Sequence, residues 1–219
     1  MIALGLFGGT FDPIHFGHLR LAQELAQRLK LREVKFIPSG VPPHRKPPHA
    51  SVPHRLAMVQ LAITGNILFS CDPRETLIPG PSYSVDTLRQ LREELGTDIA
   101  FCFLLGSDAF LGLHSWHEWQ ALFDLTHLIV AQRPGARLDP KLLPKNLAEE
   151  FISRRRPNLG FLHSNAGAIY EFEMTPLDIS ASRIRADLIN GISPRYLTPD
   201  AVIDYVTHHR LYKDTVHAA

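Results

Sequence analysis

A glycine-rich turn at residues 8–18 is the stretch of this sequence best suited to bind a phosphate group. It follows a short apolar run at residues 2–7, which indicates a buried strand, and precedes the apolar spacing of an amphipathic helix at residues 19–31. Gly8 and Gly9 allow backbone N–H groups to approach an anion closely, and a helix start adds unpaired N–H donors. A strand, a turn and a helix start in this order therefore predict a phosphate site.

Two histidines of this turn, His15 and His18, could stabilise negative charge as it develops on a transferred phosphate. We expect His15 in the loop and His18 in the first helical turn, so that both imidazoles can face one anion. Asp12 and Pro13 should shape the turn through a local cap and a fixed φ angle. Two histidines at this spacing are more often surface residues, and a zinc site is a further alternative, but no cysteine pair or further ligand pattern stands nearby.

The turn lacks the sequence patterns of the commoner nucleotide-binding and hydrolytic sites. It has no Gly-x-Gly-x-x-Gly, no Gly-Lys-Ser/Thr of a Walker loop and no serine elbow. The groups of the turn that could take part in chemistry are therefore its backbone donors, two imidazoles and one carboxylate. These groups suit electrostatic stabilisation of a phosphate in transfer.

Apolar strands alternate with amphipathic helices along most of the chain, which predicts an α/β fold with a doubly wound parallel sheet. We expect a single domain over residues 1–219, in which residues 180–212 form a small helical C-terminal part and Thr198 is an N-cap. The expected strands are 2–7, 33–38, 67–71, 99–105, 127–132 and 168–173, and the expected helices are 19–31, 53–63, 85–95, 116–123, 147–155, 182–190 and 198–209.

Composition limits the classes of partner. With 219 residues, 45% of them hydrophobic, the chain can bury one sizeable core. The net charge of +1 gives no overall attraction to a nucleic acid polymer, and no apolar run reaches the roughly 20 residues of a membrane span. Cys71 and Cys102 match no metal or redox spacing, so we expect free thiols in a cytoplasmic protein. The chain enters its first strand directly, without the pattern of a signal peptide.

Two further features lie near predicted strand ends. The loop at residues 39–53 is rich in proline and contains Arg45 and Lys46, and it is either a solvated linker or a basic flap beside the strand ends. Asp108 follows the apolar strand at residues 99–105, at the carboxyl edge of the sheet where open α/β folds bind ligands. The alternative for Asp108 is a plain helix cap.

Two motifs at opposite ends of the chain carry a family resemblance. Residues 8–18 closely resemble the signature of the nucleotidyltransferase superfamily that carries His-x-Gly-His. The superfamily's C-terminal Ile-Ser-x-Thr-x-x-Arg is matched by residues 179–185, in which Ser182 replaces threonine but keeps the hydroxyl. Within that superfamily the chain looks like the bacterial nicotinate-nucleotide adenylyltransferases, with a Rossmann-like fold. The additional matches are 42–45, with Arg45 where the family often has lysine, 81–88, 106–108, 115–116, 127–130 and 133–134.

This resemblance implies a reaction. ATP and nicotinate mononucleotide would give deamido-NAD and pyrophosphate, through in-line attack of the mononucleotide phosphate on the α-phosphorus without a covalent enzyme intermediate. A Mg²⁺ ion accompanying ATP would be held by phosphate oxygens and water, with no metal ligands from protein side chains. We expect a monomer or small homo-oligomer, with no nucleic acid polymer and no membrane as partner.

The resemblance also assigns roles. His18, assisted by His15, should stabilise the transition state at the α-phosphate. Tyr83 and Ser84 should meet the nicotinate carboxylate, and Trp116 should stack on the pyridinium ring unless it is an ordinary core tryptophan. The residues expected to bind ATP are Gly8, Gly9, Thr10, Phe11, His15, His18, Asp108, Ser180, Ser182 and Arg185, and those expected to bind nicotinate mononucleotide are Tyr83, Ser84, Trp116, Arg133, Arg45 and Lys46.

Three other interpretations stay open at this point. A phosphopantetheine adenylyltransferase or a cytidylyltransferase would share the first motif, but such chains are shorter, and the former lack the elements at Trp116 and residues 81–88. A nucleotide-binding regulator without turnover would need the phosphate-binding turn but not both His15 and His18. The joint presence of the two histidines favours an enzyme.

Overall fold

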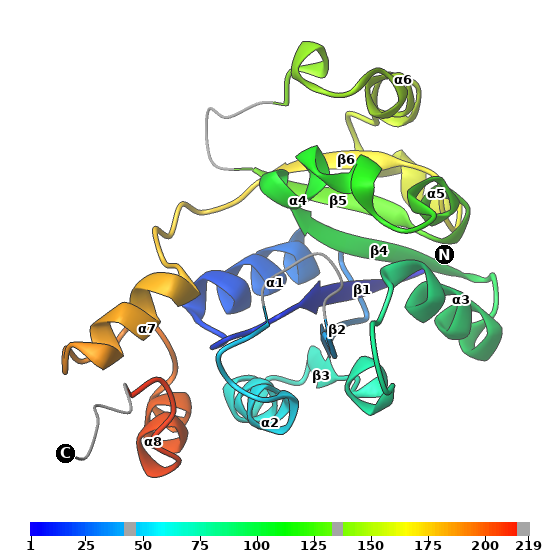
Figure 1. Cartoon of the computed structure of the whole chain (residues 1–219). Coiled ribbons are helices and arrows are strands. Elements are labelled where there is room, and N and C mark those ends of the chain that lie inside the picture. Colours follow the sequence, from blue (N-terminus) through cyan, green and yellow to red (C-terminus); the bar gives the residue numbers. More distant parts are fainter. Residues whose placement is uncertain (42–46, 133–137, 214–219) are drawn as a thin grey trace.

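The computed structural model describes residues 1–41, 47–132 and 138–213. Within these residues one parallel sheet runs in the order β3-β2-β1-β4-β5-β6, with helices on both faces (Figure 1). The doubly wound parallel sheet predicted from the sequence is therefore confirmed. Its strands are β1 Ile2–Gly9, β2 Glu33–Pro38, β3 Phe69–Cys71, β4 Ile99–Gly106, β5 His127–Gln132 and β6 Ile169–Glu173.

The helices divide into two layers around this sheet. The layer formed by α1 and α2 covers one face, with α8 packed against α2, and α3, α4, α5 and α6 cover the other. None of the helices in the described ranges is long and apolar enough to cross a membrane. Their bounds are α1 Phe16–Arg28, α2 Val52–Ile63, α3 Ser84–Leu95, α4 Ser107–Leu111, α5 Leu122–Leu125, α6 Lys145–Arg154, α7 Ala181–Ile189 and α8 Asp200–His208.

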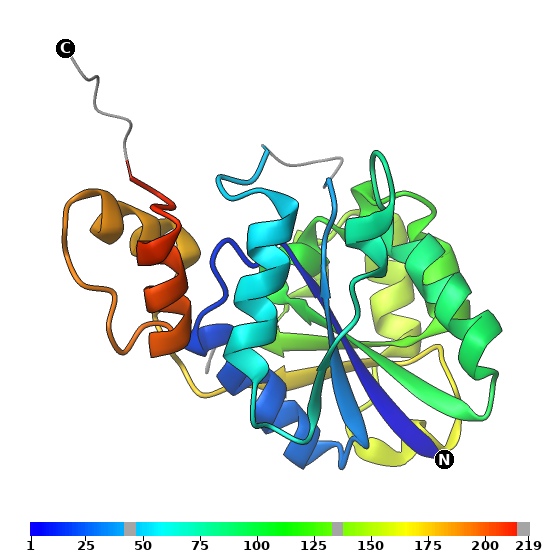
Figure 2. The same cartoon turned by 90° about the horizontal axis from the view of Figure 1, so that it is seen from below.

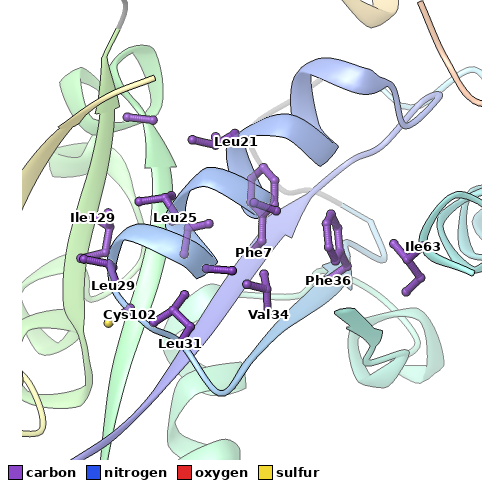
Figure 3. Close-up of a cluster of buried hydrophobic side chains, with 14 of the residues drawn as sticks. Phe7, Leu21, Leu25, Leu29, Leu31, Val34, Phe36, Ile63, Cys102 and Ile129 are labelled. Atoms are coloured by element: carbon purple, nitrogen blue, oxygen red, sulfur yellow. The ribbon is translucent and has the colours of Figure 1, made fainter. Parts of the chain in front are cut away.

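The central strand β4 shows why the sheet needs cover on both sides. Its side chains alternate between the two faces, and both sets are apolar. Cys102 and Leu104 belong to the core under α1, whereas Phe101 and Phe103 belong to the core under α3. Figure 3 shows the first core, in which Phe7, Leu21, Leu25, Leu29, Leu31, Val34, Phe36, Ile63, Cys102 and Ile129 lie together.

The sheet order places the first turn at a point where ligands bind in folds of this kind. The strand β1 pairs with β2 on one side and with β4 on the other, so the chain order reverses on either side of β1. In open parallel sheets this reversal leaves a crevice at the carboxyl ends of the two strands. The turn at residues 8–18 begins at the carboxyl end of β1 and therefore borders that crevice.

The C-terminal helices α7 and α8 lie at one end of the molecule, with α8 beside α2 (Figure 2). Backbone and side-chain bonds attach them to the first turn: the Phe16 amide donates to the Leu197 carbonyl at 3.0 Å, and the Thr198 hydroxyl donates to the Ile14 carbonyl at 2.8 Å. The expectation that Thr198 is a helix N-cap is therefore wrong, and Pro199 holds that position. The buried hydroxyl satisfies a carbonyl of the turn instead. The single-domain description of residues 1–219 stays a prediction.

Some element bounds differ from the sequence pattern. The helix expected at residues 19–31 begins at Phe16 and ends at Arg28. Leu29 and Leu31 are buried beyond its end, so their burial extended the apolar pattern without extending the helix. The strand expected at residues 67–71 begins two residues later, because a turn precedes it, in which the Phe69 amide donates to the Asn66 carbonyl at 3.1 Å.

The helix expected at residues 116–123 is wrong. Glu118 has a left-handed φ of 46°, and helical structure begins only at Trp119, as a 3₁₀ turn that leads into α5. The left-handed backbone at Glu118 interrupts the helix, and the Glu118 carboxylate pairs with Arg89 of α3. The short helix α4, by contrast, has too few residues to show a period and was not predicted.

The attachment of the C-terminal part can be tested at Tyr212. Its hydroxyl donates to Asp12 Oδ1 at 2.7 Å. We expect Tyr212→Phe to lower the free energy of unfolding by about 2 kcal/mol, because it removes a hydrogen bond to a buried carboxylate. Tyr196→Phe is the control, since Tyr196 is exposed and should change stability by less than about 0.5 kcal/mol. Equal effects of the two changes in urea unfolding would contradict the attachment.

Candidate active site

The glycine at the end of β1 leaves space for the aromatic ring of Phe11. Gly8 and Gly9 are the last residues of β1, and the left-handed residue of the turn is Phe11, with a φ of 49°. A Cβ atom on Gly9 would lie 2.8 Å from Phe11 Cζ, so the glycine is needed for close approach of the Phe11 ring. The expectation that Gly8 and Gly9 allow backbone N–H groups to approach an anion stays a prediction.

The two histidines of the turn lie face to face. His15 is the N-cap of α1 and His18 is in its first turn, as expected. Their rings stack with centroids 3.7 Å apart, and the His15 amide donates to His18 Nδ1 at 3.2 Å. A neutral His18 that accepts at Nδ1 carries its proton on Nε2, so Nε2 is its remaining donor.

The surroundings of these rings keep both imidazoles neutral at pH 7. Burial lowers the pKa of His15 to about 4. Burial, with a further contribution from the charge of His15, lowers the pKa of His18 well below its usual 6.5. The Phe11 ring meets His18 edge-on at 5.1 Å, and Gly17 admits the His15 ring, since a Cβ there would lie 3.0 Å from His15 Nδ1.

Asp12 is a long-range anchor, so its expected role as a local cap of the turn is wrong. Its carboxylate accepts hydrogen bonds from the amides of His49 at 2.7 Å and Ala50 at 3.0 Å and from the Tyr212 hydroxyl. The Arg185 Nη1 atom donates to the Asp12 carbonyl at 2.6 Å. Asp12 thereby connects the turn to three distant parts of the chain, at residues 49–50, Arg185 and Tyr212.

Arg55 of α2 holds the first turn through hydrogen bonds, and the sequence did not predict this role. Its side chain is fully buried in α2, where Nη1 donates to the Thr10 carbonyl and Nη2 to the Gly40 carbonyl, both at 2.8 Å. Burial lowers the pKa of this guanidinium, and the charge of Asp12 opposes the shift. One feature of the sequence indicated that Arg55 is buried. It lies three residues before Met58 and four before Val59, on the apolar face of its helix.

The start of α7 lies next to the first turn. A Cβ on Gly17 would lie 3.7 Å from the Ile179 carbonyl, so the two motifs from the ends of the chain are adjacent. Ser180 is the N-cap of α7 and accepts from the Arg183 amide at 3.3 Å, and its hydroxyl lies 3.2 Å from that of Ser182. Both serines are exposed, beside the backbone donors of the helix start.

Asp108 lies on the other side of the crevice. It follows β4, in the first turn of α4, and its side chain is exposed. Gly106 is the N-cap of this helix, which does not support the alternative that Asp108 is a plain cap. Within the described ranges its carboxylate has no hydrogen-bond or ion-pair partner.

The two tryptophans have different environments. Trp119 is buried in the core under α5, whereas Trp116 is only half buried and meets the Phe103 ring edge-on at 6.4 Å. The Phe103 ring is also the neighbour that a Cβ on Gly8 would contact, at 3.5 Å. Phe103 thus links the end of β1 to Trp116.

The start of α3 presents free backbone donors. Tyr83 is its N-cap, and its carbonyl accepts from the amides of Asp86 and Thr87. The amides of Ser84 and Val85 have no partner in the described part of the chain, which leaves two N–H groups at the positive end of the helix. The Tyr83 ring packs against His117, with centroids 4.5 Å apart.

Three predicted substrate-binding residues, Arg45, Lys46 and Arg133, lie outside the described residues, as does the question of a basic flap at residues 42–46. Among the residues that the structure describes, no group of three or more histidine, cysteine, aspartate or glutamate side chains could hold a metal ion.

Comparisons with known proteins agree with this geometry. A family model described as cytidylyltransferase-like matches residues 6–187. A solved structure titled Plasmodium falciparum nicotinic acid mononucleotide adenylyltransferase complexed with NaAD has a TM-score of 0.73 at 18% identity, over 97% of this chain and 98% of that chain, and so shares the fold. Fold and site thus define a nucleotidyltransferase of the cytidylyltransferase-like class.

Two curated relatives give the family more closely. Both bear the name "Probable nicotinate-nucleotide adenylyltransferase". The one from Dechloromonas aromatica is 50% identical over 213 residues, 97% of this chain and 98% of the relative. The one from Pseudomonas aeruginosa is 44% identical over 210 residues, 96% and 97% of the two chains. The chain therefore belongs to the nicotinate-nucleotide adenylyltransferase family, which confirms the resemblance seen in the sequence.

The neutral state of His15 can be tested through stability. The folded pKa of about 4 lies below the usual 6.5, so the unfolded chain binds the proton first and stability is lost as the pH falls through this window. Between pH 7 and pH 5 we expect the unmodified chain to lose about 2 kcal/mol of unfolding free energy that His15→Asn does not lose. The exposed His163, changed to asparagine, should leave the loss unaltered. Parallel pH profiles for all three proteins in urea unfolding would refute the assignment.

Proposed function

We propose that this chain transfers the adenylyl group of ATP to nicotinate mononucleotide, giving deamido-NAD and pyrophosphate as a step of NAD biosynthesis. The observation that carries this proposal is the stacked pair of neutral imidazoles, His15 and His18, at the start of α1 beside the start of α7. The mononucleotide phosphate attacks the α-phosphorus in line, and pyrophosphate leaves on the opposite side. Because the substrate supplies the nucleophile, the protein contributes positioning and charge stabilisation.

On the ATP side, the start of α1 faces the α-phosphate. The His18 Nε2–H donates to the oxygens on which charge develops, and His15 assists on the neighbouring phosphates. Gly8, Gly9, Thr10 and Phe11 supply the backbone of the turn. The start of α7, with Ser180 and Ser182, binds the β- and γ-phosphates, and Asp108 accepts hydrogen bonds from the ribose hydroxyls.

Arg185 contributes to the phosphate site through the turn. Its Nη1 already donates to the Asp12 carbonyl, which leaves its other guanidinium donors for a phosphate oxygen. This geometry supports an indirect role, in which Arg185 fixes the loop that presents His15, together with a direct one.

On the acceptor side, the start of α3 binds the nicotinate carboxylate. The free amides of Ser84 and Val85 suit a carboxylate, since backbone N–H groups at a helix start favour negative charge. The half-buried Trp116 stacks on the pyridinium ring, and Tyr83 closes the same site. Arg45, Lys46 and Arg133 are proposed for the mononucleotide phosphate from sequence resemblance.

A Mg²⁺ ion fits this site as a companion of ATP. The described residues of the site include no cluster of carboxylates that could hold the ion, and the histidines of the turn are neutral donors. Phosphate oxygens and water would therefore hold the ion. When bound it would neutralise charge on the triphosphate. The protein residues keep the same tasks: His15 and His18 donate to the phosphates, and the start of α7 orients them.

We also propose that the chain works in the cytoplasm. Burial raises the pKa of Cys71 to about 11 and that of Cys102 to about 12, so neither thiol is reactive at neutral pH. Unpaired, unreactive thiols suit a reducing cytoplasm. We expect a monomer or small homo-oligomer that acts on the two nucleotides alone, without nucleic acid or membrane.

The role of His18 is tested by its removal. In an assay of pyrophosphate release from ATP, Mg²⁺ and nicotinate mononucleotide, we expect His18→Ala to lower kcat by about a thousandfold, because a donor to the developing charge is lost. Circular dichroism should show an intact fold. His163→Ala, at an exposed histidine, is the control and should keep normal turnover. A near-normal kcat for His18→Ala would remove its role, and release with phosphopantetheine instead would change the proposed substrate.

The carboxylate site is tested by the choice of substrate. Nicotinamide mononucleotide carries an amide where nicotinate mononucleotide carries a carboxylate, so the Ser84 and Val85 amides lose a charged acceptor. We expect kcat/KM to fall by at least about a hundredfold with the amide substrate. Equal values for the two substrates would overturn the assignment of the start of α3.

A further inference from the structure

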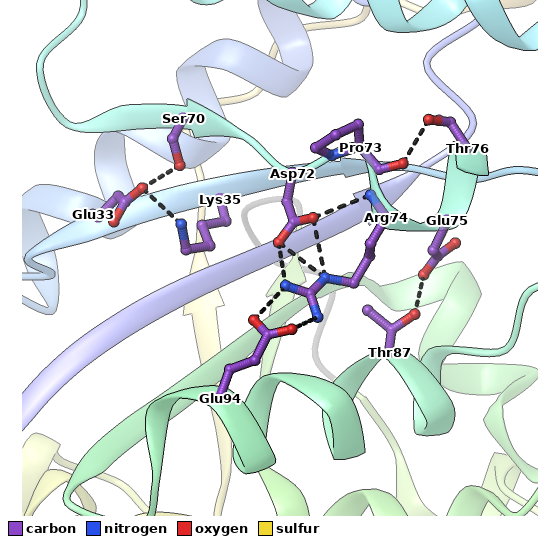
Figure 4. Close-up of polar contacts among 10 residues, drawn as sticks. All are labelled: Glu33, Lys35, Ser70, Asp72, Pro73, Arg74, Glu75, Thr76, Thr87 and Glu94. Carbon is purple, nitrogen blue, oxygen red and sulfur yellow. Dashed lines mark hydrogen bonds and ion pairs between the residues drawn. The ribbon is translucent and has the colours of Figure 1, made fainter. Parts of the chain in front are cut away.

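A buried carboxyl group lies directly behind the start of α3. Glu75 belongs to the 3₁₀ turn Arg74–Leu77, and its side chain is buried. One carboxyl oxygen accepts the Ser82 hydroxyl at 2.9 Å, and the other accepts the Thr87 hydroxyl at 2.7 Å. Figure 4 shows the contact between Glu75 and Thr87. Both partners are themselves buried, so these bonds form without water.

The two bonds bracket the first turn of α3. Ser82 immediately precedes the N-cap Tyr83, and Thr87 is the fourth residue of the helix. A single carboxyl group therefore holds the chain before and after the amides of Ser84 and Val85. The Tyr83 carbonyl engages the next two amides, so the free pair is held within a rigid turn.

The backbone of the same residue packs against a segment that is bonded to the phosphate turn. The Glu75 carbonyl leaves no space for a side chain at Gly40, where a Cβ atom would lie 2.3 Å from it. The Gly40 carbonyl in turn accepts from Arg55, which also holds the Thr10 carbonyl. Glu75 is thus connected to the first turn through Gly40 and Arg55.

We propose that Glu75 is a positioning residue that sets the preference for an acceptor with a carboxylate over one with an amide. It acts by holding the Ser84 and Val85 amides where the carboxylate of the acceptor binds. This inference rests on the proposed function and deepens it. Loosening the first turn of α3 costs affinity for the anionic acceptor more than for the neutral one, because two converging N–H donors favour the charged acceptor.

The environment of the Glu75 carboxyl group makes glutamine the conservative substitution at this position. Burial raises the pKa of this carboxyl group, while the hydroxyl bonds from Thr87 and Ser82 oppose the shift. Glutamine has nearly the same shape and keeps an oxygen for one hydroxyl and an amide for the other. Alanine leaves both hydroxyls without the partner that fixes the turn.

The far end of α3 offers a matched control. Arg74, the neighbour of Glu75, binds Asp72 at 2.8 Å and Glu94 near the end of α3 at 2.9 Å, as Figure 4 shows. Glu94→Gln therefore weakens the attachment of the same helix to the same 3₁₀ turn, away from its start. The Glu94 side chain is largely exposed, so the change should have little effect on stability.

The experiment compares steady-state kinetics of Glu75→Ala, Glu75→Gln and Glu94→Gln with those of the unmodified chain. For Glu75→Ala we expect KM for nicotinate mononucleotide to rise about tenfold while KM for ATP changes less than about twofold. The kcat/KM preference for nicotinate over nicotinamide mononucleotide should fall about tenfold as well. Glu75→Gln should restore most of both, and Glu94→Gln should match the unmodified chain.

Several results would overturn the inference. They are an unchanged preference in Glu75→Ala, an equal rise in KM for both mononucleotides, or the same shift in Glu94→Gln. If Glu75→Ala does not fold, Thr87→Val decides, because it removes one of the two bonds to Glu75. We then expect a lowered preference, and an unchanged preference at a lowered melting temperature would indicate a purely structural role. An unmodified chain without turnover of nicotinate mononucleotide would refute the proposed function itself, which separates the two failures.

Discussion

The buried carboxylate of Asp12 is the interaction on which the site depends. A buried carboxylate is costly unless its oxygens are well paired, and here two amides and a tyrosine hydroxyl pair them. These donors come from residues 49–50 and from Tyr212, so satisfying one charge brings three distant segments together. The Arg185 bond to the Asp12 carbonyl adds the second motif to the same point. The active site is therefore assembled only when the ends of the chain meet.

That assembly has an electrostatic consequence for the histidines. Packed among aromatic rings and against each other, His15 and His18 are kept neutral. In the proposed reaction they would therefore act as oriented N–H donors and not as fixed cations. Neutral donors hold a triphosphate less tightly in the ground state than two cations would, yet still gain strength as charge develops on the transferred group. The amino-terminal ends of α1 and α7 supply the remaining positive potential through the backbone.

The sequence predicted the sheet well because both faces of the central strands are apolar, and β2 and β5 match the expected ranges residue for residue. It also predicted the positions of His15 and His18 at the start of the first helix, because these follow from a local pattern. It did not predict the partners of Asp12, Arg55 or Glu75, because these bonds join residues far apart in sequence and leave no periodic signal. Nor did it predict the left-handed backbone at Glu118, which interrupts the helix expected at residues 116–123.

Arg55 and the backbone of Glu75 both contact Gly40, and this junction connects the two proposed half-sites. Arg55 reaches the turn proposed for ATP, and Glu75 reaches the helix start proposed for the acceptor. In-line transfer needs both phosphates within a few tenths of an ångström of their reactive geometry, so the two half-sites must keep a fixed separation. Two buried, fully packed side chains provide that separation better than exposed ion pairs, whose long side chains stay mobile. A side chain at Gly40 would disturb this junction, because its Cβ atom would lie 2.3 Å from the Glu75 carbonyl.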